Sequence, residues 1–243
     1  MSEEEKEQTV QEEDEHGNIL IYWRKQFLAV VLKAESYMTP KFSPLNLAGS
    51  LIFIGVLQWF MTVLAAETLF PGYSSRTNDL SDLASTIPPN ISVVQPSAML
   101  FNTTTFLIGL LVIISAFLIH QACKKRLFTA LFAISGLAAM GVGVFPGDNG
   151  NIHALVAMAW FVTGPLSAIV AYGFLNKPFA YFSVAIGAFA LIVLISAVFA
   201  GQSSPFLAFG RGGEERMLAY PVVLWMMAFA GYLMGFAQMN EGK

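Results

Sequence analysis

Three polar clusters hold the residues of this sequence that could do chemistry, and apolar stretches separate them. The first is NDLSDL at residues 78–83, the second is FPGDNGNIH at residues 145–153, and the third is GRGGEERMLAYP at residues 210–221. Carboxylates, a histidine and arginines occur in these clusters. Such groups, once brought together, could transfer protons and hold a polar or anionic group.

Proton transfer is the chemistry that the second cluster suggests. His153 is predicted to open a helix, directly after a tight turn that carries Asp148. Imidazole is the side chain most often used as a general base, and a hydrogen-bonding partner orients it. We therefore take His153 as the catalytic candidate, with Asp82 or Asp148 as the orienting partner. The alternative is a hydrogen-bonded structural histidine at a membrane interface.

Six further polar residues are candidates for binding a substrate: Asn78, Ser81, Asn102, Glu215, Arg216 and Tyr220. Asn102 would lie roughly 9 Å along a helix that starts near residue 96, deep enough to need a partner. For the polar residues of the first cluster, helix capping and loop bracing by Asp and Ser are the structural alternative.

Arg216 is the hardest of these residues to explain by helix capping. It lies at a predicted helix start, where a cation opposes the helix dipole. We expect it to pair with Asp82, Asp148 or Glu215, or to bind an anion such as a lipid phosphate. Glu215 itself suits a helix start whatever the function, because acids are favoured there.

Several classes of ligand are not expected. Only one histidine and no cysteine accompany the three polar clusters, which argues against a zinc site, and no spacing demands a harder cation. Nucleic-acid binding needs basic residues clustered on one face, and the sequence supplies none. We predict no metal, no cofactor and no nucleic acid, and membrane lipids as the partners.

The composition places the clusters in an integral membrane protein. Hydrophobic residues make up 56% of the 243 residues and charged residues only 12%, whereas a soluble domain carries about 25% charged residues. Six apolar stretches are each near the ~20 residues that span a bilayer core, at residues 45–66, 96–120, 127–145, 152–175, 179–200 and 217–238. The predicted fold is all-α, a polytopic membrane bundle of six transmembrane helices preceded by an interfacial amphipathic helix.

The distribution of basic residues predicts the orientation. If the N-terminus is cytoplasmic, the inner segments hold ten of the 13 Lys and Arg residues, and cytoplasmic loops are the ones enriched in these residues. The predicted location is the plasma membrane, crossed several times, with both termini cytoplasmic. The loop at residues 67–96 is then extracellular, and all three polar clusters lie at the outer face.

The chain divides into three regions. Residues 1–17 form an acidic tail with too little apolar surface to order, and residues 18–44 resemble an amphipathic helix at the cytoplasmic membrane interface. Residues 45–243 form the transmembrane domain. In its last helix, Gly231 and Gly235 have the spacing that lets helices approach closely. Packing within the chain is the favoured interpretation, and a homo-oligomer or a membrane-complex partner is the alternative.

The order of the motifs resembles a known family. The motifs that carry the similarity follow in this order: NDLSDL, PPN, an F-N entering the second helix, FPGD…H opening the fourth helix and ER…YP…W opening the sixth. The sequence is in this way similar to a prokaryotic six-helix membrane family, domain of unknown function 998. A more distant resemblance is to DRAM-type and GPI-anchor lipid-remodelling membrane proteins. The resemblance implies six helices and one outer polar cluster, onto which map Ser81, Asp82, Asn102, His153 and Glu215. It implies no reaction.

Two functions fit these observations. The first is a lipid-modifying hydrolase or transferase acting at the outer membrane face, with His153 as the base. The second is a non-catalytic membrane subunit that binds lipid or supports assembly or sensing. A transporter is disfavoured because the predicted spans carry no ionisable residue near their middle. Whether the protein is an enzyme stays open at this point.

Overall fold

The computed structural model describes residue 22, residues 24–31 and residues 43–241. Residues 24–31 form a short helix in a first unit, and the remaining elements belong to a second unit, Ser43–Lys243. The predicted tail at residues 1–17 and most of the predicted interfacial segment at residues 18–44 lie outside the described residues.

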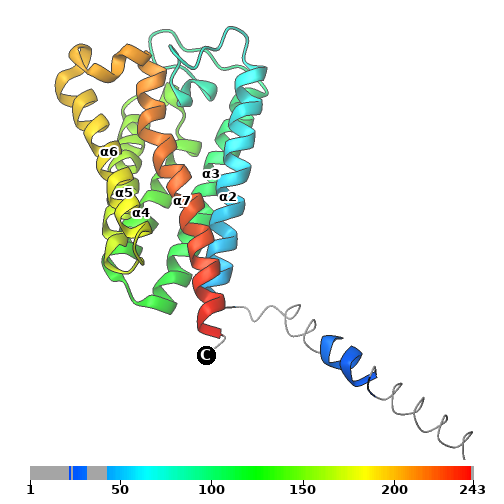
Figure 1. Cartoon of the computed structure of the whole chain (residues 1–243). Helices are drawn as coiled ribbons and strands as arrows, with labels where there is room; N and C mark the ends of the chain where they lie inside the picture. The colour runs from blue at the N-terminus through cyan, green and yellow to red at the C-terminus, as the bar shows by residue number, and fades with distance from the viewer. Residues whose placement is uncertain (1–21, 23, 32–42, 242–243) are drawn as a thin grey trace, which may run out of the picture. The chain divides into compact units, whose positions relative to one another are not determined.

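The second unit consists of six long helices, and the longest connection between them is the loop at residues 70–96, between the first and the second (Figure 1). All six are long and apolar enough to cross a membrane, which confirms the predicted fold class. Their bounds are α2 Pro44–Leu69, α3 Ser97–Cys123, α4 Arg126–Val144, α5 Asn151–Val170, α6 Phe179–Ala200 and α7 Arg211–Glu241. Within the described part of the chain there is no β-strand.

Local sequence signals set several helix ends. Ser43 caps α2, since its hydroxyl accepts a hydrogen bond from the Leu45 N–H at 3.3 Å. Lys124 adopts a left-handed conformation (φ 54°) that ends α3 and directs the chain into α4. Gly150, with φ 55°, makes the corresponding turn before α5. These short turns keep successive helices antiparallel and adjacent.

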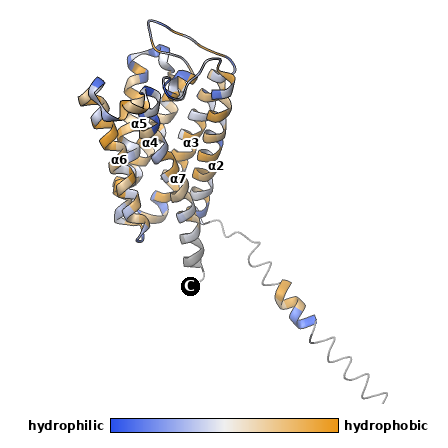
Figure 2. Ribbon diagram, turned by 45° about the horizontal axis from the view of Figure 1, so that its top comes forward, coloured by the Kyte–Doolittle hydropathy of each residue, from blue (hydrophilic) through white to orange (hydrophobic). Residues whose placement is uncertain are grey.

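The helices form a closed ring in chain order. Each packs against the next, and α7 returns to pack against α2. Figure 2 shows mainly hydrophobic helices, with the more hydrophilic segments gathered towards their ends. We call the end that carries the connections at residues 70–96, 145–150 and 201–210 the loop end. The loop end is therefore where distant polar clusters can meet.

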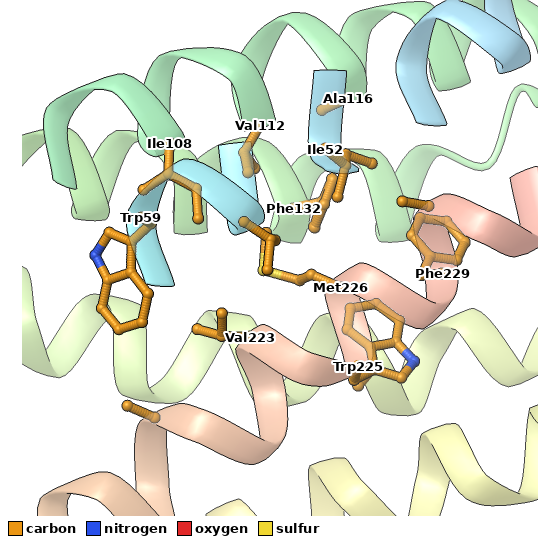
Figure 3. Packing of buried hydrophobic residues seen from close by; sticks show 14 of the residues in the cluster. Ile52, Trp59, Ile108, Val112, Ala116, Phe132, Val223, Trp225, Met226 and Phe229 are labelled. Carbon is orange, nitrogen blue, oxygen red and sulfur yellow. The ribbon is translucent and has the colours of Figure 1, made fainter. Parts of the chain in front are cut away.

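Aromatic side chains fill the core between α4 and α7. Phe132, Trp225 and Phe229 lie together (Figure 3), with the rings of Trp225 and Phe229 stacked at 5.2 Å. The Trp225 indole N–H donates to the Ser183 hydroxyl at 2.8 Å. A buried donor in an apolar interior needs such a partner, so this bond also fixes α6 against α7.

Small residues let some of the helices approach closely, but not at the pair for which the sequence predicted it. A Cβ atom added at Gly187 would lie 2.5 Å from the Pro165 carbonyl oxygen, so Gly187 packs inside the bundle. Gly231 and Gly235 meet nothing within 4 Å among the described residues. Within the part of the chain that the structure describes, this pair therefore makes no close helix contact, and both the packing and the oligomer or partner interface stay predictions.

The last helix begins earlier than predicted. Its first residue is Arg211 rather than residue 217, so Glu215 and Arg216 lie inside the helix and not ahead of it. Glycines at positions 212 and 213 weaken the sequence signal for a helix. Gly212 is nevertheless required there, because a Cβ atom would lie 2.1 Å from the Asn78 carbonyl oxygen of the covering loop.

Candidate functional site

The loop after α2 folds back over the loop end and is braced by its own polar residues. Its short 3-10 helix, Leu80–Leu83, begins after Asp79. Asp82 accepts hydrogen bonds from the Asp79 N–H at 3.0 Å and the Asn78 side-chain amide at 3.2 Å. Burial raises the pKa of the Asp82 carboxyl, and the Asn78 hydrogen bond partly offsets that rise. Asn78 and Asp82 thus shape the loop.

Arg216 clamps this loop and α2 to α7. Its Nη2 donates to Glu67 Oε1 and to the Tyr73 hydroxyl, both at 2.7 Å. Its Nη1 donates to three carbonyl oxygens, those of Ser75, Asn78 and Gly212, at 2.9–3.1 Å. Arg216 is only 9% exposed. Both terminal nitrogens of the guanidinium are therefore occupied within the protein.

The ion pair of Arg216 with Glu67 corrects the predicted pairing with Asp82, Asp148 or Glu215. Glu67 is the last acidic residue of α2, and the loop beyond it wraps around the start of α7. The start of α7 is therefore in contact with the end of α2, where Glu67 lies. Sequence separation gave no sign of this contact, because it depends on how the loop turns.

Further contacts join the same loop to the first turns of α7. Arg211 and Asp79 form an exposed ion pair at 2.7 Å, and the Gly212 N–H donates to the Arg76 carbonyl at 3.0 Å. The Leu80 N–H donates to Glu215 Oε2. We call these contacts between residues 73–80 and residues 211–216 the loop–α7 junction. It ties the loop after α2 to the start of α7.

Tyr73 completes the loop–α7 junction. Its hydroxyl donates to the Asp79 carbonyl at 2.8 Å and accepts from Arg216. Burial raises the pKa of Tyr73 well above its ordinary value, so the hydroxyl keeps the proton that it donates. The ring also lies 5.6 Å from the Arg216 guanidinium, a distance at which a cation–π contact adds to the ion pair.

Beneath the junction lies a cavity lined by all the long helices except α6. The volume open to the centre of a water-sized sphere is about 80 Å³. Polar residues at its loop end are Ser81, His153 and Glu215. The deeper walls are mainly apolar and include Trp59, Phe101, Ile108, Val112, Trp160, Val223 and Met226, several of which Figure 3 shows. We call this space the central cavity.

His153 is held in the central cavity with one nitrogen engaged and one open. Its Nδ1 lies 2.8 Å from the Phe145 carbonyl oxygen, which can only accept, so Nδ1 carries the proton. In the neutral ring, Nε2 then has a lone pair, and no described residue hydrogen-bonds to it. The ring is buried, with 7% of the residue exposed. His153 can therefore accept a proton from a molecule in the cavity.

The Phe145 carbonyl, rather than a carboxylate, orients His153, which corrects the predicted role of Asp82 or Asp148. Phe145 follows the last residue of α4, where carbonyls lack helical partners. The short turn to α5 brings this carbonyl to the imidazole. Asp148 is exposed at that turn, and its contact is the Asn149 amide at 3.1 Å. Asp82 is bonded within the loop.

The remaining binding candidates do not line the central cavity. Asn102 lies on the face of α3 towards Gly143, and its buried side-chain oxygen has no partner in the described structure. The Tyr220 ring packs against Trp59 and Phe60 at 6.3 and 5.3 Å. Of the six binding candidates, Ser81 and Glu215 thus reach the cavity with His153. Asn78, Asn102, Arg216 and Tyr220 do not.

The apolar walls were missed by the sequence reasoning. Ala157, Trp160 and Phe161 line the central cavity from α5 together with His153. They follow the histidine at i+4, i+7 and i+8, the spacing of one helix face. That periodicity was present in the sequence. It could have indicated which apolar residues accompany His153.

Comparison with known proteins identifies the family. The family model described as Protein of unknown function (DUF998) matches residues 53–232. The chain belongs to this family. The matched residues include every residue named above as lining the central cavity, as well as the loop–α7 junction. No curated protein and no solved structure matches the chain significantly.

Three polar side chains of different chemistry meet at the loop end of the cavity. No group of three or more His, Cys, Asp or Glu residues is arranged to hold a metal ion in the part of the chain that the structure describes. The cavity offers a proton acceptor at His153, a hydroxyl at Ser81 and a carboxyl at Glu215. Together they suit a ligand with a polar end and an apolar body.

Proposed function

We propose that this membrane protein binds a lipid in the central cavity and modifies its polar end, as a hydrolase or transferase with His153 as the general base. The observation that carries the proposal is the open Nε2 of a buried histidine at the polar end of an apolar cavity. The proposal sets this end at the outer leaflet of the plasma membrane, with both termini cytoplasmic. The concentration of Lys and Arg at the opposite end supports that orientation.

The shape and lining of the cavity favour a lipid over a small polar substrate. A water molecule needs about 10–15 Å³ of such volume, and the cavity has about 80 Å³ with mainly apolar walls. Several waters in such walls would lack hydrogen-bonding partners. A hydrocarbon segment would instead bury apolar surface against Ile108, Val112 and Met226, deep in the cavity.

Each polar residue has a distinct role in this proposal. His153 Nε2 accepts the proton of an attacking hydroxyl, from water or an acceptor alcohol, while the hydroxyl oxygen bonds to the carbonyl or phosphoryl centre of the lipid. The proton then passes to the departing oxygen of the lipid. Ser81 hydrogen-bonds the head group. Glu215, which accepts a hydrogen bond from the Leu80 N–H, also accepts hydrogen bonds from the hydroxyl groups of the lipid head group.

A second function, a non-catalytic subunit that binds lipid or supports assembly or sensing, has its own support. Much of the polar cluster is engaged in bracing: Arg216 makes five hydrogen bonds within the protein. Asp82 is likewise bonded by two groups of its own loop. In this alternative the cavity retains a lipid without changing it.

Lipid analysis of three strains tests the proposed function. Strains lacking the gene, or carrying His153→Gln, should lose one modified lipid and accumulate its precursor. His120→Gln is the matched control, because His120 is a half-buried histidine of α3 that bonds Thr129, away from the cavity. A wild-type lipid profile in the deletion strain, with lipid still retained by the purified protein, would favour the non-catalytic alternative.

A further inference from the structure

A second concavity lies between α6 and α7, and it is separate from the central cavity. It has about 720 Å³ open to the centres of water-sized spheres, and it shares no lining residue with the central cavity. Its walls come from α6, α7, the 3-10 helix Pro205–Phe209 and the loop after α2. We call it the α6–α7 groove.

The body of the groove is apolar and lies along two membrane-spanning helices. Ile186 and Phe189 line it from α6, and Pro221 and Leu224 line it from α7. Phe189 is 40% exposed and Leu224 is 54% exposed. In a bilayer these side chains face hydrocarbon, so an acyl chain is the natural filling of the groove.

A cation stands at the loop end of the groove without a balancing acid. Arg76 lines the groove, and its Nη2 makes one long hydrogen bond, to the Ala208 carbonyl at 3.4 Å. The other two arginines at this end are paired, Arg211 with Asp79 and Arg216 with Glu67. Arg76 has no ion pair among the described residues, and no acidic residue lines the groove. The local charge at the mouth is therefore positive.

The backbone beneath Arg76 is fixed by two glycines. A Cβ atom at Gly210, whose φ is 83°, would lie 2.1 Å from the Arg76 carbonyl oxygen, so only glycine allows this approach. The same carbonyl accepts from the Gly212 N–H at 3.0 Å. The loop therefore holds the Arg76 backbone in one place above the apolar groove.

We propose that the α6–α7 groove binds an anionic phospholipid, with the phosphate on Arg76 and one acyl chain along α6 and α7. Arginine is well suited to phosphate, and basic residues at head-group level attract anionic lipids. A zwitterionic lipid would bring an ammonium group to a mouth that offers it no carboxylate. The groove thus selects a net negative head group, whether or not the central cavity is catalytic.

Native mass spectrometry of the delipidated full-length protein in detergent tests this site. The probes are dioleoylphosphatidylglycerol and dioleoylphosphatidylcholine, each added at increasing concentration. The wild-type protein should bind dioleoylphosphatidylglycerol more tightly than dioleoylphosphatidylcholine. Arg76→Gln should weaken the binding of dioleoylphosphatidylglycerol about five-fold, the effect of about one basic residue at head-group level. Arg211→Gln is the matched control, since it removes an exposed arginine that is paired and does not line the groove; it should leave binding unchanged.

Further measurements test whether the groove binds the acyl chain as well as the phosphate, and whether this binding is independent of the central cavity. Leu224→Trp, which fills the apolar part, should lower binding of both lipids, whereas glycerol 3-phosphate in excess should not displace the lipid. His153→Gln should leave binding in the groove intact even if the proposed reaction fails. Equal binding of the two lipids by the wild type, no effect of Arg76→Gln, or full displacement by glycerol 3-phosphate would each overturn the proposal.

Discussion

The loop–α7 junction and the central cavity lie next to each other but use their polar groups in opposite ways. At the junction, Arg216 gives hydrogen bonds to five acceptors, and the loop carbonyls around it are bonded. In the cavity, the imidazole of His153 uses Nδ1 for the Phe145 carbonyl and leaves Nε2 open. The polar groups of the loop–α7 junction are used to hold the structure together, whereas the central cavity keeps the Nε2 atom of His153 free to react.

Polar residues of the junction therefore contribute mainly to stability, and polar residues of the cavity mainly to binding or catalysis. Buried polar groups that are fully bonded fix a single arrangement, and removing one partner leaves the others unsatisfied. An open lone pair beside an apolar space contributes little to that arrangement. Mutations in the two regions should therefore give opposite patterns, with loss of folding at the junction and loss of turnover or binding at the cavity.

The largest effect on folding is expected from Arg216→Met. The change keeps much of the apolar stem but removes five hydrogen bonds and leaves the Glu67 carboxylate without its ion-pair partner. Removing one partner of a buried ion pair costs about 3–5 kcal/mol of unfolding free energy. Thermal unfolding in detergent measures the loss. Arg211→Gln, at an exposed pair, should cost only about 0–1 kcal/mol, and equal losses for the two variants would contradict the comparison.

His153→Gln should give the reverse pattern. If Nε2 is the proton acceptor, turnover of the lipid falls by about 10²–10⁴-fold. The unfolding free energy falls by only about 1 kcal/mol, for one buried hydrogen bond to the Phe145 carbonyl. Product formation and thermal unfolding are measured on the same preparation. A variant that keeps full turnover would remove His153 from the chemistry, and His120→Gln controls for the loss of a histidine elsewhere.

Filling the central cavity tests lipid binding without touching a polar group. Ala157 lines the cavity one turn after His153, so Ala157→Phe should displace about three methylene groups, each worth about 0.8 kcal/mol, and weaken lipid binding about 50-fold. Ala154→Phe adds the same ring to the same helix at an exposed position and should bind normally. Lipid retained after purification is quantified by mass spectrometry. Equal retention by both variants would mean that the lipid lies elsewhere.

Hydropathy and charge were enough to predict the fold and most helix bounds. Apolar length dictates where a chain can cross a bilayer, and it found α6 at residues 179–200, the bounds that the structure has. The exception was α7, whose first turns carry two glycines and three charged residues after Arg211. Those residues look like a loop by composition. In the structure they are helical, and the covering loop packs closely against Gly212.

The candidate site was predictable in part, and the reason lies in loop geometry. His153, Ser81 and Glu215 were all candidates from the sequence, and the structure brings them to one cavity. The partners of Arg216 and His153 were predicted wrongly, since they are Glu67 and the Phe145 carbonyl. Every residue has a backbone carbonyl, so the residue types do not show which carbonyl will accept a hydrogen bond. Such partners follow from turn conformations that residue types alone do not specify.

The smallest effect concerns the pH dependence of stability at Asp82, within the loop that covers the cavity. Burial raises the pKa of this carboxyl when the protein is folded, so the folded state binds a proton at pH values where the unfolded state does not. Acidification from neutral pH through that raised pKa then adds stability, and the gain is complete below the ordinary pKa of the unfolded chain. Asp82→Asn is neutral at every pH and still offers an amide oxygen to the Asp79 N–H.

The variant should therefore unfold at a slightly higher temperature than wild type at neutral pH, because its side chain has no charge to bury when the chain folds. That difference should shrink towards zero as the pH falls to about 4, where the unfolded carboxyl also becomes protonated. Thermal unfolding in detergent across this range measures both curves. A difference that stays constant with pH would show that Asp82 acts through the geometry of its hydrogen bonds and not through its charge. The loop would then behave like the loop–α7 junction, in which bonding geometry decides stability.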